Sequence, residues 1–171
     1  MDDPGESLVG SYLHYIVGCQ LVLHNTVTPG EQGELDVIGV QLTDATRTVW
    51  FCEVTTHIQG FNYGEFESTV RKVRDKIRRA RVFADATFPD HVHHYEIWSP
   101  VVRVGRLTEA FDRLESEFSE DDLNVKFVIN ERYSQRVREL VEHARKNTSA
   151  TSEPAYRLLQ ILTRLRGEWR V

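Results

Sequence analysis

The sequence predicts an α/β domain in which one mixed β-sheet is flanked by helices. Three observations predict this class: helical periodicity near the N-terminus, three strand-like runs separated by turn residues, and a long amphipathic helix that precedes further strand and helix patterns. Elements in this order are typical of a sheet with helices packed on its faces. With 171 residues, the chain suits one domain with one hydrophobic core.

The first half of the chain accounts for two helices and three strands. Residues 6–18 are expected to form a helix because their apolar side chains recur every three or four positions before a glycine that would end it. Runs at 20–27, 34–42 and 48–55 are strand-like and are joined by turn-like segments, which predicts a three-stranded meander. Residues 64–84 carry an apolar stripe of helical period and end before a Phe-Pro-Asp break. If the strands on either side of this helix are parallel, the crossover is right-handed.

The second half continues with alternating strands and helices. Strands are predicted at 93–98 and 124–129, and helices at 106–118 and 133–146. These strands would extend the mixed sheet, and the helices would flank it.

The last part of the chain is predicted to be distinct from the domain formed by residues 1–147. Residues 148–171 begin as a polar linker and continue as an amphipathic helix. Pro154 suits the first turn of that helix, and its apolar side chains continue at helical spacing to Leu165. We expect the helix either to pack on the core or to lie at a dimer interface.

Composition argues against several classes of protein. The apolar share of 40% and the charged share of 27% are ordinary for a globular protein, and no apolar run approaches the about 20 residues needed to cross a bilayer. The acidic start lacks the basic and apolar regions of a secretion signal, so a cytoplasmic protein is expected. Cys19 and Cys52 are then expected to be reduced, and their apolar neighbours favour buried packing. Phosphate-loop, serine-hydrolase and zinc-protease motifs are absent from the sequence.

The net charge of −5 averages over two opposed blocks. The basic block lies in the long predicted helix and consists of Arg71, Lys72, Arg74, Lys76, Arg78, Arg79 and Arg81. An acidic block follows between residues 109 and 122. The basic block is either a solvated helix face or a surface that contacts the phosphates of nucleic acid. All of its members except the last are candidate nucleic-acid-binding residues.

Two carboxylates stand on neighbouring predicted strands where apolar side chains are expected. If the turn between these strands spans residues 43–46, Asp36 lies opposite Glu53 with their Cβ atoms about 5 Å apart. A one-residue slip would turn Glu53 to the other face of the sheet. Ligands that are all oxygen atoms favour Mg²⁺ or Mn²⁺ over zinc. The alternative is a pair of strand-end carboxylates that face solvent.

Three short motifs resemble those of a known nuclease superfamily. They are Gly5-Glu6 at the start of the first helix, Gly33-Glu34-Leu35-Asp36-Val37-Ile38 in the second strand, and Trp50-Phe51-Cys52-Glu53-Val54-Thr55 in the third. In this order, and followed by a basic helix, they are similar to the PD-(D/E)xK nuclease superfamily, and within it to archaeal Holliday-junction resolvases and their small bacterial relatives. The resemblance covers about the first half of the chain. It implies a restriction-endonuclease-like αβββαβ core, here with additional C-terminal helices.

The resemblance also implies a metal site and a function. By similarity, Glu6, Asp36, Glu53 and the backbone carbonyl of Val54 would bind Mg²⁺ or Mn²⁺. The function implied is metal-dependent hydrolysis of phosphodiester bonds in nucleic acid, with DNA the preferred substrate. Resolvases act as dimers on two-fold junctions, which adds a homodimer to the expected partners.

The third motif departs from the family at its last position. The family carries a lysine where this chain has Thr55, and that lysine orients the attacking water and offsets negative charge in the transition state. Some members take a lysine from the next helix instead. Lys72 is the preferred substitute here and Lys76 the less preferred one. His57 would share the strand face of Glu53 if the strand continues, so it could donate a proton or position water.

The candidate catalytic set therefore combines the two carboxylates with three further residues. It comprises Asp36, Glu53, Thr55, His57 and Lys72. The rival class is a catalytically inactive protein of the same fold that serves as a DNA-binding or protein-interaction module. Thr55 keeps this alternative open, because a hydroxyl cannot supply the positive charge of a lysine.

Overall fold

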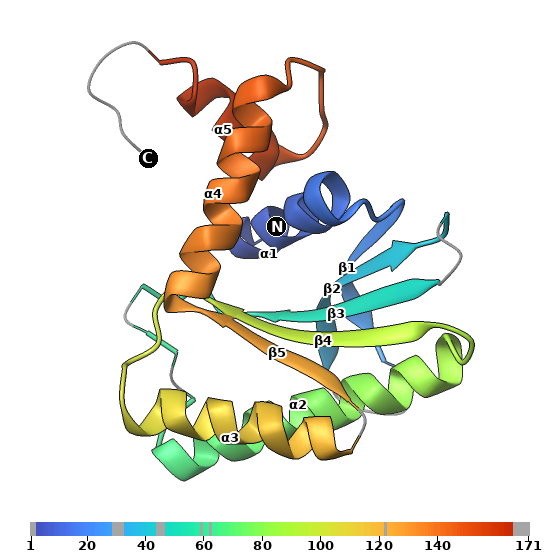
Figure 1. Cartoon of the computed structure of the whole chain (residues 1–171), viewed down its shortest axis with the longest axis vertical. Coiled ribbons are helices and arrows are strands. Elements are labelled where there is room, and N and C mark those ends of the chain that lie inside the picture. Colours follow the sequence, from blue (N-terminus) through green and yellow to red (C-terminus); the bar gives the residue numbers. More distant parts are fainter. Residues whose placement is uncertain are drawn as a thin grey trace.

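A computed structural model describes the chain over residues 3–28, 33–43, 47–58, 60–61, 63–121 and 123–165. At its centre is a five-stranded sheet in the order β1-β2-β3-β4-β5 (Figure 1). The first three strands form an antiparallel meander. Strands β4 and β5 continue the sheet beyond β3 and run parallel to it. Helices cover both faces of the sheet, so the predicted α/β class with one mixed sheet is confirmed.

The strands begin and end close to the predicted positions. They are β1 (Leu21–Val27), β2 (Glu34–Gln41), β3 (Thr48–Val54), β4 (Val92–Ser99) and β5 (Asn124–Ile129). Strand β3 makes the sheet mixed, because it pairs antiparallel with β2 and parallel with β4. The parallel pair needs a long connection between its strands, and the long predicted helix supplies it.

The helices account for most of the remaining described residues. They are α1 (Pro4–Tyr12), the π-helical segment η1 (Leu13–Val17), α2 (Phe66–Thr87), α3 (Arg106–Glu120), α4 (Asn130–Lys146) and α5 (Pro154–Leu162). The single helix predicted over 6–18 is thus divided into α1 and η1, and it ends at Gly18 as predicted. The φ of 86° at Gly18 is one that glycine adopts without strain. Across the described ranges, no helix has the length and apolar character to span a membrane.

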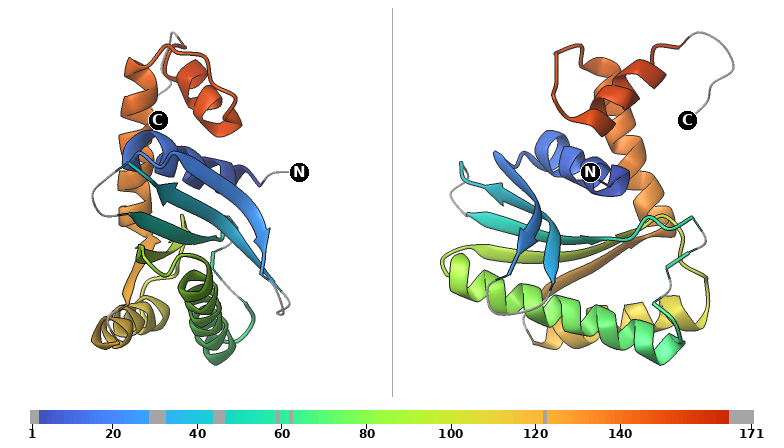
Figure 2. Two further views of the ribbon diagram at one scale, coloured as in Figure 1. Left: turned by 90° about the vertical axis from the view of Figure 1, so that its right-hand side faces the viewer. Right: turned by 180° about the vertical axis from the view of Figure 1, so that it is seen from behind.

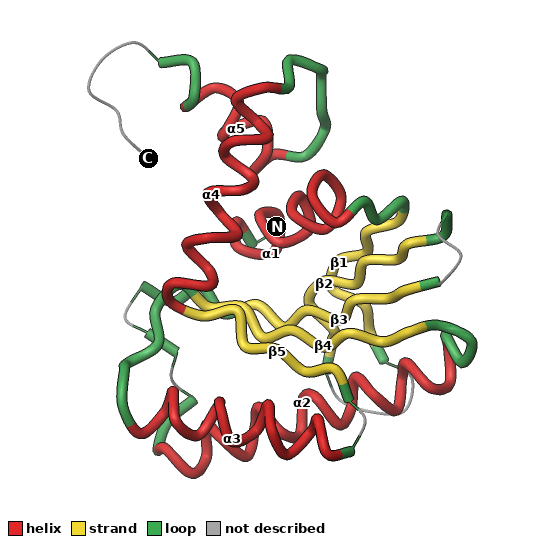
Figure 3. Tube along the Cα trace, viewed as in Figure 1, coloured by secondary structure: helices red, strands yellow, loops and turns green. Residues whose placement is uncertain are grey.

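Several helix boundaries differ from the sequence prediction. Helix α2 begins later and ends later than the predicted range of 64–84. Helix α4 begins at Asn130, earlier than predicted, because it follows β5 with no intervening loop (Figure 3). The predicted continuation of α5 to Leu165 is wrong, since the helix ends at Leu162. Residues 166–171 lie outside the described part of the chain.

Helices α2 and α3 lie on one face of the sheet, and α1, α4 and α5 lie on the other (Figures 1 and 2). Each face has its own buried hydrophobic cluster. Ile38 and Phe51 belong to the cluster under α2, whereas their neighbours Val37 and Cys52 belong to the cluster under α1. This alternation is the two-residue period of a strand with both faces covered. Cys52, like Cys19, is buried and free of a disulfide, as predicted.

The C-terminal helix α5 packs on η1 and α4 through an aromatic side chain. Tyr156 is fully buried, and its ring stacks on that of Tyr15 with centroids 3.8 Å apart. Its hydroxyl lies 2.6 Å from Nδ1 of His143, so its polar end has a partner. These contacts make α5 part of the core of the domain. Burial of an aromatic ring of this size stabilises a fold by roughly 2 kcal/mol.

Candidate active site

The register of β2 and β3 brings the two predicted carboxylates to the same end of the sheet. Val37 pairs with Cys52 and Gln41 pairs with Thr48, which is the register expected from a turn over residues 43–46. Continuing this register by one pair places Asp36 opposite Glu53. Each of the two side chains is only 9% exposed. Of the two arrangements left open by the sequence, the buried pair is the one found.

Asp36 is held by the backbone of the neighbouring strand. Its Oδ2 accepts a hydrogen bond from the backbone N–H of Val54 at 2.7 Å. Burial raises the pKa of the Asp36 carboxyl, while the bond from Val54 and the positive charge of Lys76 oppose that rise. The carboxylate thus joins the start of β2 to the end of β3.

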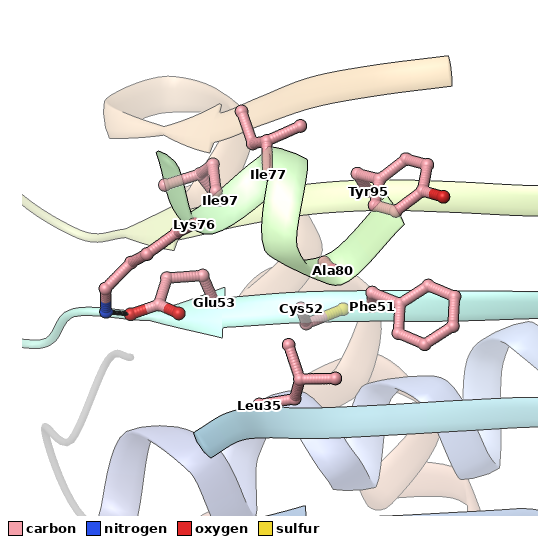
Figure 4. A pocket seen from close by; sticks show the side chains of 9 residues that line it. All are labelled: Leu35, Phe51, Cys52, Glu53, Lys76, Ile77, Ala80, Tyr95 and Ile97. Atoms are coloured by element: carbon pink, nitrogen blue, oxygen red, sulfur yellow. Dashed lines mark hydrogen bonds and ion pairs between the residues drawn. The ribbon is translucent and has the colours of Figure 1, made fainter. Parts of the chain in front are cut away.

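Glu53 forms an ion pair with a lysine from α2. Oε1 of Glu53 accepts a hydrogen bond from Nζ of Lys76, and Figure 4 shows the two side chains pointing toward each other from β3 and α2. Burial lowers the pKa of Lys76, while the nearby Asp36 carboxylate opposes that effect. The ammonium therefore occupies the side of Glu53 that faces α2.

The helical period of α2 explains why Lys76 enters the site. Val73 and Ile77 are buried on the side of α2 that faces the sheet, and Lys76 lies next to Ile77 on this stripe. Lys72 is exposed, and its Nζ lies 5.6 Å from the ring centroid of Tyr63. Lys72 was the preferred substitute for the motif lysine on sequence grounds, but the contacts favour Lys76.

Thr55, at the place of the motif lysine, contacts Tyr63, which is not among the predicted site residues. Thr55 is 5% exposed, and its Oγ1 lies 2.9 Å from the hydroxyl of Tyr63. The same hydroxyl accepts a hydrogen bond from Nζ of Lys76 at 3.5 Å. Tyr63 lies in the irregular segment between β3 and α2, where no periodic pattern could indicate the direction of its side chain.

Glu6 approaches the carboxylates from the first turn of α1. The helix begins at a capping residue, Asp3, whose Oδ1 accepts a hydrogen bond from Gly5 N–H at 2.7 Å. Burial raises the pKa of Glu6, the negative charge of Asp36 adds to this rise, and a hydrogen bond with Asn25 opposes it. Its Oε2 is buried and has no hydrogen-bond partner among the described residues. A buried carboxylate oxygen without a donor is a group that a cation would satisfy.

The glycine of the first motif has a packing role. A Cβ atom at Gly5 would lie 2.1 Å from Cγ2 of Thr56, in the segment that follows β3. The absence of a side chain therefore lets the start of α1 approach the end of β3, and that approach places Glu6 near Asp36.

His57 lies outside this group of side chains. It is exposed in the segment after β3, and its backbone carbonyl accepts a hydrogen bond from Gly60 N–H at 2.9 Å. The strand ends at Val54, so the continuation that would have aligned His57 with Glu53 does not form.

The basic residues of α2 divide into three sets. Arg74 pairs with Glu117 of α3 at 2.7 Å, and Arg81 is 3.7 Å from Asp85. The side chains of Lys72, Asp75, Lys76 and Arg79 line a shallow cavity of about 270 Å³. Arg71 and Arg78 are exposed.

One member of the cavity, Arg79, also lies against the chain just before β2. A Cβ atom at Gly33 would lie 2.1 Å from Nη1 of Arg79, so a larger residue would displace the flexible end of the arginine side chain. The φ of 142° at Gly33 is what favours glycine here, because other residues rarely adopt it. Arg79 therefore connects the basic cavity to the start of β2, the strand that carries Asp36.

The carboxylates suit a hydrated cation better than a closed protein cage. Over the described residues, no group of three or more histidine, cysteine, aspartate or glutamate side chains is arranged to hold a metal ion. Asp36 and Glu53 nevertheless offer two carboxylates, the number that Mg²⁺ can use when it keeps several water ligands. Glu6 is close enough for its pKa to respond to the charge of Asp36. Oxygen ligands of this kind are compatible with Mg²⁺ or Mn²⁺ in a site completed by water.

Comparison with known proteins returned no relative. No family model matches the chain, and no curated protein and no solved structure matches it.

Proposed function

We propose that the protein is a metal-dependent endonuclease that hydrolyses phosphodiester bonds of nucleic acid, with DNA as the preferred substrate. The observation that carries the proposal is the ammonium of Lys76, held against Glu53 and close to Asp36. Two carboxylates and one lysine are the groups of the PD-(D/E)xK site, and here the lysine comes from α2. The order α1-β1-β2-β3-α2-β4 also supports a restriction-endonuclease-like core.

Each residue of the site has a chemical task in this proposal. Asp36, Glu53 and the carbonyl of Val54 would hold the ion, with Glu6 beside them. A bound Mg²⁺ or Mn²⁺ ion would polarise the phosphodiester and lower the pKa of a bound water. Lys76 donates hydrogen bonds to the attacking water or to a phosphate oxygen, and its positive charge offsets the negative charge that develops there.

The lowered pKa of Lys76 is compatible with these tasks. Burial favours the neutral amine, while the neighbouring carboxylates favour the ammonium. The tasks above need the ammonium, so the carboxylates beside Lys76 support them by opposing the effect of burial.

The basic cavity of α2 supports nucleic acid as the substrate. Lys72 and Arg79 lie one turn of the helix before and after Lys76, so their charges can contact phosphates on either side of the bond at the site. Arg74 contributes less to such binding because it is engaged with Glu117 of α3. The overall net charge of −5 makes the local arrangement of cations decisive.

A second candidate function is a non-catalytic module of the same fold that binds DNA or another protein. The observation that favours it is that Lys76 already neutralises Glu53. A lysine fixed permanently in this pair would exclude the ion and leave only the basic surface to function.

The test of the proposal is cleavage of labelled single-stranded DNA, duplex DNA, four-way-junction DNA and RNA in Mg²⁺, Mn²⁺ or EDTA. Asp36→Asn, Glu53→Gln and Lys76→Met are each expected to lower cleavage by roughly 100-fold or more. Lys146→Met, at the end of α4, is the matched control and should leave cleavage unchanged. The three site variants together exclude a contaminating nuclease.

Titration calorimetry with Mn²⁺ separates the two candidate functions. Mn²⁺ binding by the wild type that is lost in Asp36→Asn, together with cleavage, supports the nuclease. A wild type that cuts none of the substrates and binds no Mn²⁺ overturns it in favour of the non-catalytic module. Binding to DNA would then be compared between Arg79→Ala and Arg74→Ala, and the first is expected to have the greater effect.

A further inference from the structure

We propose that Thr55 and Tyr63 position Lys76 for its role at Glu53, so that the residue at the place of the motif lysine serves to hold the lysine that comes from α2. This inference rests on the proposed function for the role of Lys76. It adds two positioning residues, Thr55 and Tyr63, neither of which needs to touch the substrate.

Hydrogen bonds connect Lys76 to Tyr63 and Tyr63 to Thr55. A protonated lysine can only donate, so Nζ of Lys76 donates to the hydroxyl oxygen of Tyr63 at 3.5 Å. The single hydroxyl proton of Tyr63 is then available for Oγ1 of Thr55, 2.9 Å away. The Tyr63 oxygen can also accept from Lys76 and Thr55 together, so either hydroxyl can be the donor in this bond. In both cases the bond needs a hydroxyl at position 55, which a serine supplies and a valine does not.

Thr55 holds one end of this series of hydrogen bonds in a defined position. It is 5% exposed, and its backbone N–H donates to the carbonyl of Trp98 at 2.9 Å, which ties it to the end of β4. Its position is therefore set by the central strands of the sheet, which are the least mobile part of such a fold.

Tyr63 is oriented from two further directions. Its ring meets the ring of Phe61 edge-on, with centroids 5.1 Å apart, and its backbone N–H donates to Oγ1 of Thr69 at 3.1 Å. Thr69 belongs to the first turn of α2, the helix that carries Lys76. The tyrosine thus links the segment after β3 to the helix that supplies the lysine.

Lys76 gains a second contact with the same tyrosine. Nζ lies 5.3 Å from the centroid of the Tyr63 ring, within the range at which a cation is attracted to an aromatic face. Glu53 alone would leave the long side chain of Lys76 several rotamers in which the ion pair could form. Tyr63 restricts these rotamers from a second direction and so defines the position of the ammonium.

The first test measures the position of Lys76 without any nuclease activity. The chain has four lysines, Lys72, Lys76, Lys126 and Lys146, so their acylation rates can be followed separately by mass spectrometry of the full-length protein. We expect Tyr63→Phe and Thr55→Val to raise the acylation rate of Lys76 by about threefold to tenfold. The rates of Lys126 and Lys146 should not change, and Thr55→Ser should return Lys76 to the wild-type rate.

Unchanged acylation of Lys76 in both Tyr63→Phe and Thr55→Val would overturn the positioning role. An equal rise at all four lysines would also overturn it, because that result indicates general loosening of the fold. Circular dichroism and thermal unfolding of each variant identify the second case directly.

The second test uses cleavage and moves the lysine between the two positions. Lys76→Met is expected to lower kcat by roughly 100-fold or more, and the double variant Lys76→Met/Thr55→Lys, which returns a lysine to the motif position, should have a kcat at least about tenfold above that of Lys76→Met. Thr55→Val should lower kcat by about tenfold with KM unchanged, and Thr55→Ser should restore it. A fall in KM and kcat together, or a Thr55→Ser variant as poor as Thr55→Val, contradicts positioning.

The two tests fail in different ways. If the wild type cuts no nucleic acid, the proposed function fails, and the acylation rates still decide whether Thr55 and Tyr63 hold Lys76. If the wild type cuts but Tyr63→Phe changes neither the acylation of Lys76 nor kcat, the positioning inference fails and the nuclease stands.

Discussion

Glu115 of α3 and Arg132 of α4 form an ion pair, with 2.7 Å between Oε1 and Nη1, across the outer edge of β5. Both side chains also bond to the backbone of that strand. Oε1 of Glu115 accepts from Phe127 N–H at 2.6 Å, and Nη1 of Arg132 donates to the Phe127 carbonyl at 3.2 Å. The pair therefore occupies the N–H and carbonyl of Phe127, two backbone groups to which a strand of another chain could bond at this edge of the sheet.

Loss of the Glu115 side chain should make the protein self-associate. In Glu115→Ala the N–H of Phe127 loses its acceptor, and the edge of β5 is open to pairing with a second strand. We expect dimers or larger species whose fraction grows with concentration, measured by size-exclusion chromatography with light scattering. Glu120→Ala, on the same helix, is the control and should remain as the wild type. A monomeric Glu115→Ala at all concentrations would show that the edge needs no cover.

The ion pair between Glu53 and Lys76 should be measurable by a double-mutant cycle. Lys76→Met leaves the buried carboxylate of Glu53 without its cation, so we expect a loss of roughly 2 kcal/mol in the free energy of unfolding. Adding Glu53→Gln to this variant should recover part of the loss, since the uncompensated charge is then removed. Urea unfolding of the wild type, both single variants and the double variant gives the coupling. Strictly additive losses would mean that the two side chains do not interact in solution.

Gly5 should not tolerate a side chain unless Thr56 is made smaller. In Gly5→Ala the new methyl group would meet Cγ2 of Thr56, and we expect a loss of about 1–3 kcal/mol in unfolding free energy. Thr56→Ser removes that carbon, so Gly5→Ala/Thr56→Ser should be more stable than the sum of the single losses predicts. Thermal unfolding of the four proteins measures this difference. If Gly5→Ala is as stable as the wild type, the close approach of α1 to the end of β3 is not required.

The buried carboxyl of Glu96 should make stability depend on pH. Glu96 is 6% exposed, and burial raises its pKa, although the hydrogen bond from Nε1 of Trp98 at 2.8 Å opposes the rise. Because the folded state holds this proton more tightly than the unfolded state, its contribution is complete below the unfolded pKa. It is lost as the pH rises through the folded pKa.

Glu96→Gln keeps an acceptor for Trp98 but removes the ionisation. Its stability relative to the wild type should therefore increase from acid to neutral and alkaline pH, as measured by urea unfolding between about pH 4.5 and 8. Glu109→Gln, an exposed change on α3, should run parallel to the wild type over this range. A Glu96→Gln curve that also runs parallel to the wild type would mean that Glu96 titrates as it does in the unfolded chain.

Local pattern in the sequence was sufficient for the order of the elements, but it left two arrangements open for the carboxylates. Given a turn over residues 43–46, the two-residue period of β2 and β3 brings Asp36 and Glu53 to the same end of the sheet, and the register of the folded chain agrees with that turn. The apolar stripe of α2 likewise predicts which side of that helix faces the core. These features depend on residues that are close in the chain, and short-range backbone geometry is what a sequence pattern encodes.

Only the tertiary structure decided which lysine of α2 pairs with Glu53. Lys72 and Lys76 both border the apolar stripe of α2, so the pattern is nearly the same for each. Which of them reaches Glu53 depends on how far α2 slides along the sheet and how it rotates about its axis, and core packing sets both. The hydroxyl contact between Thr55 and Tyr63 has the same origin, because it joins a strand end to an irregular segment that has no period to predict from.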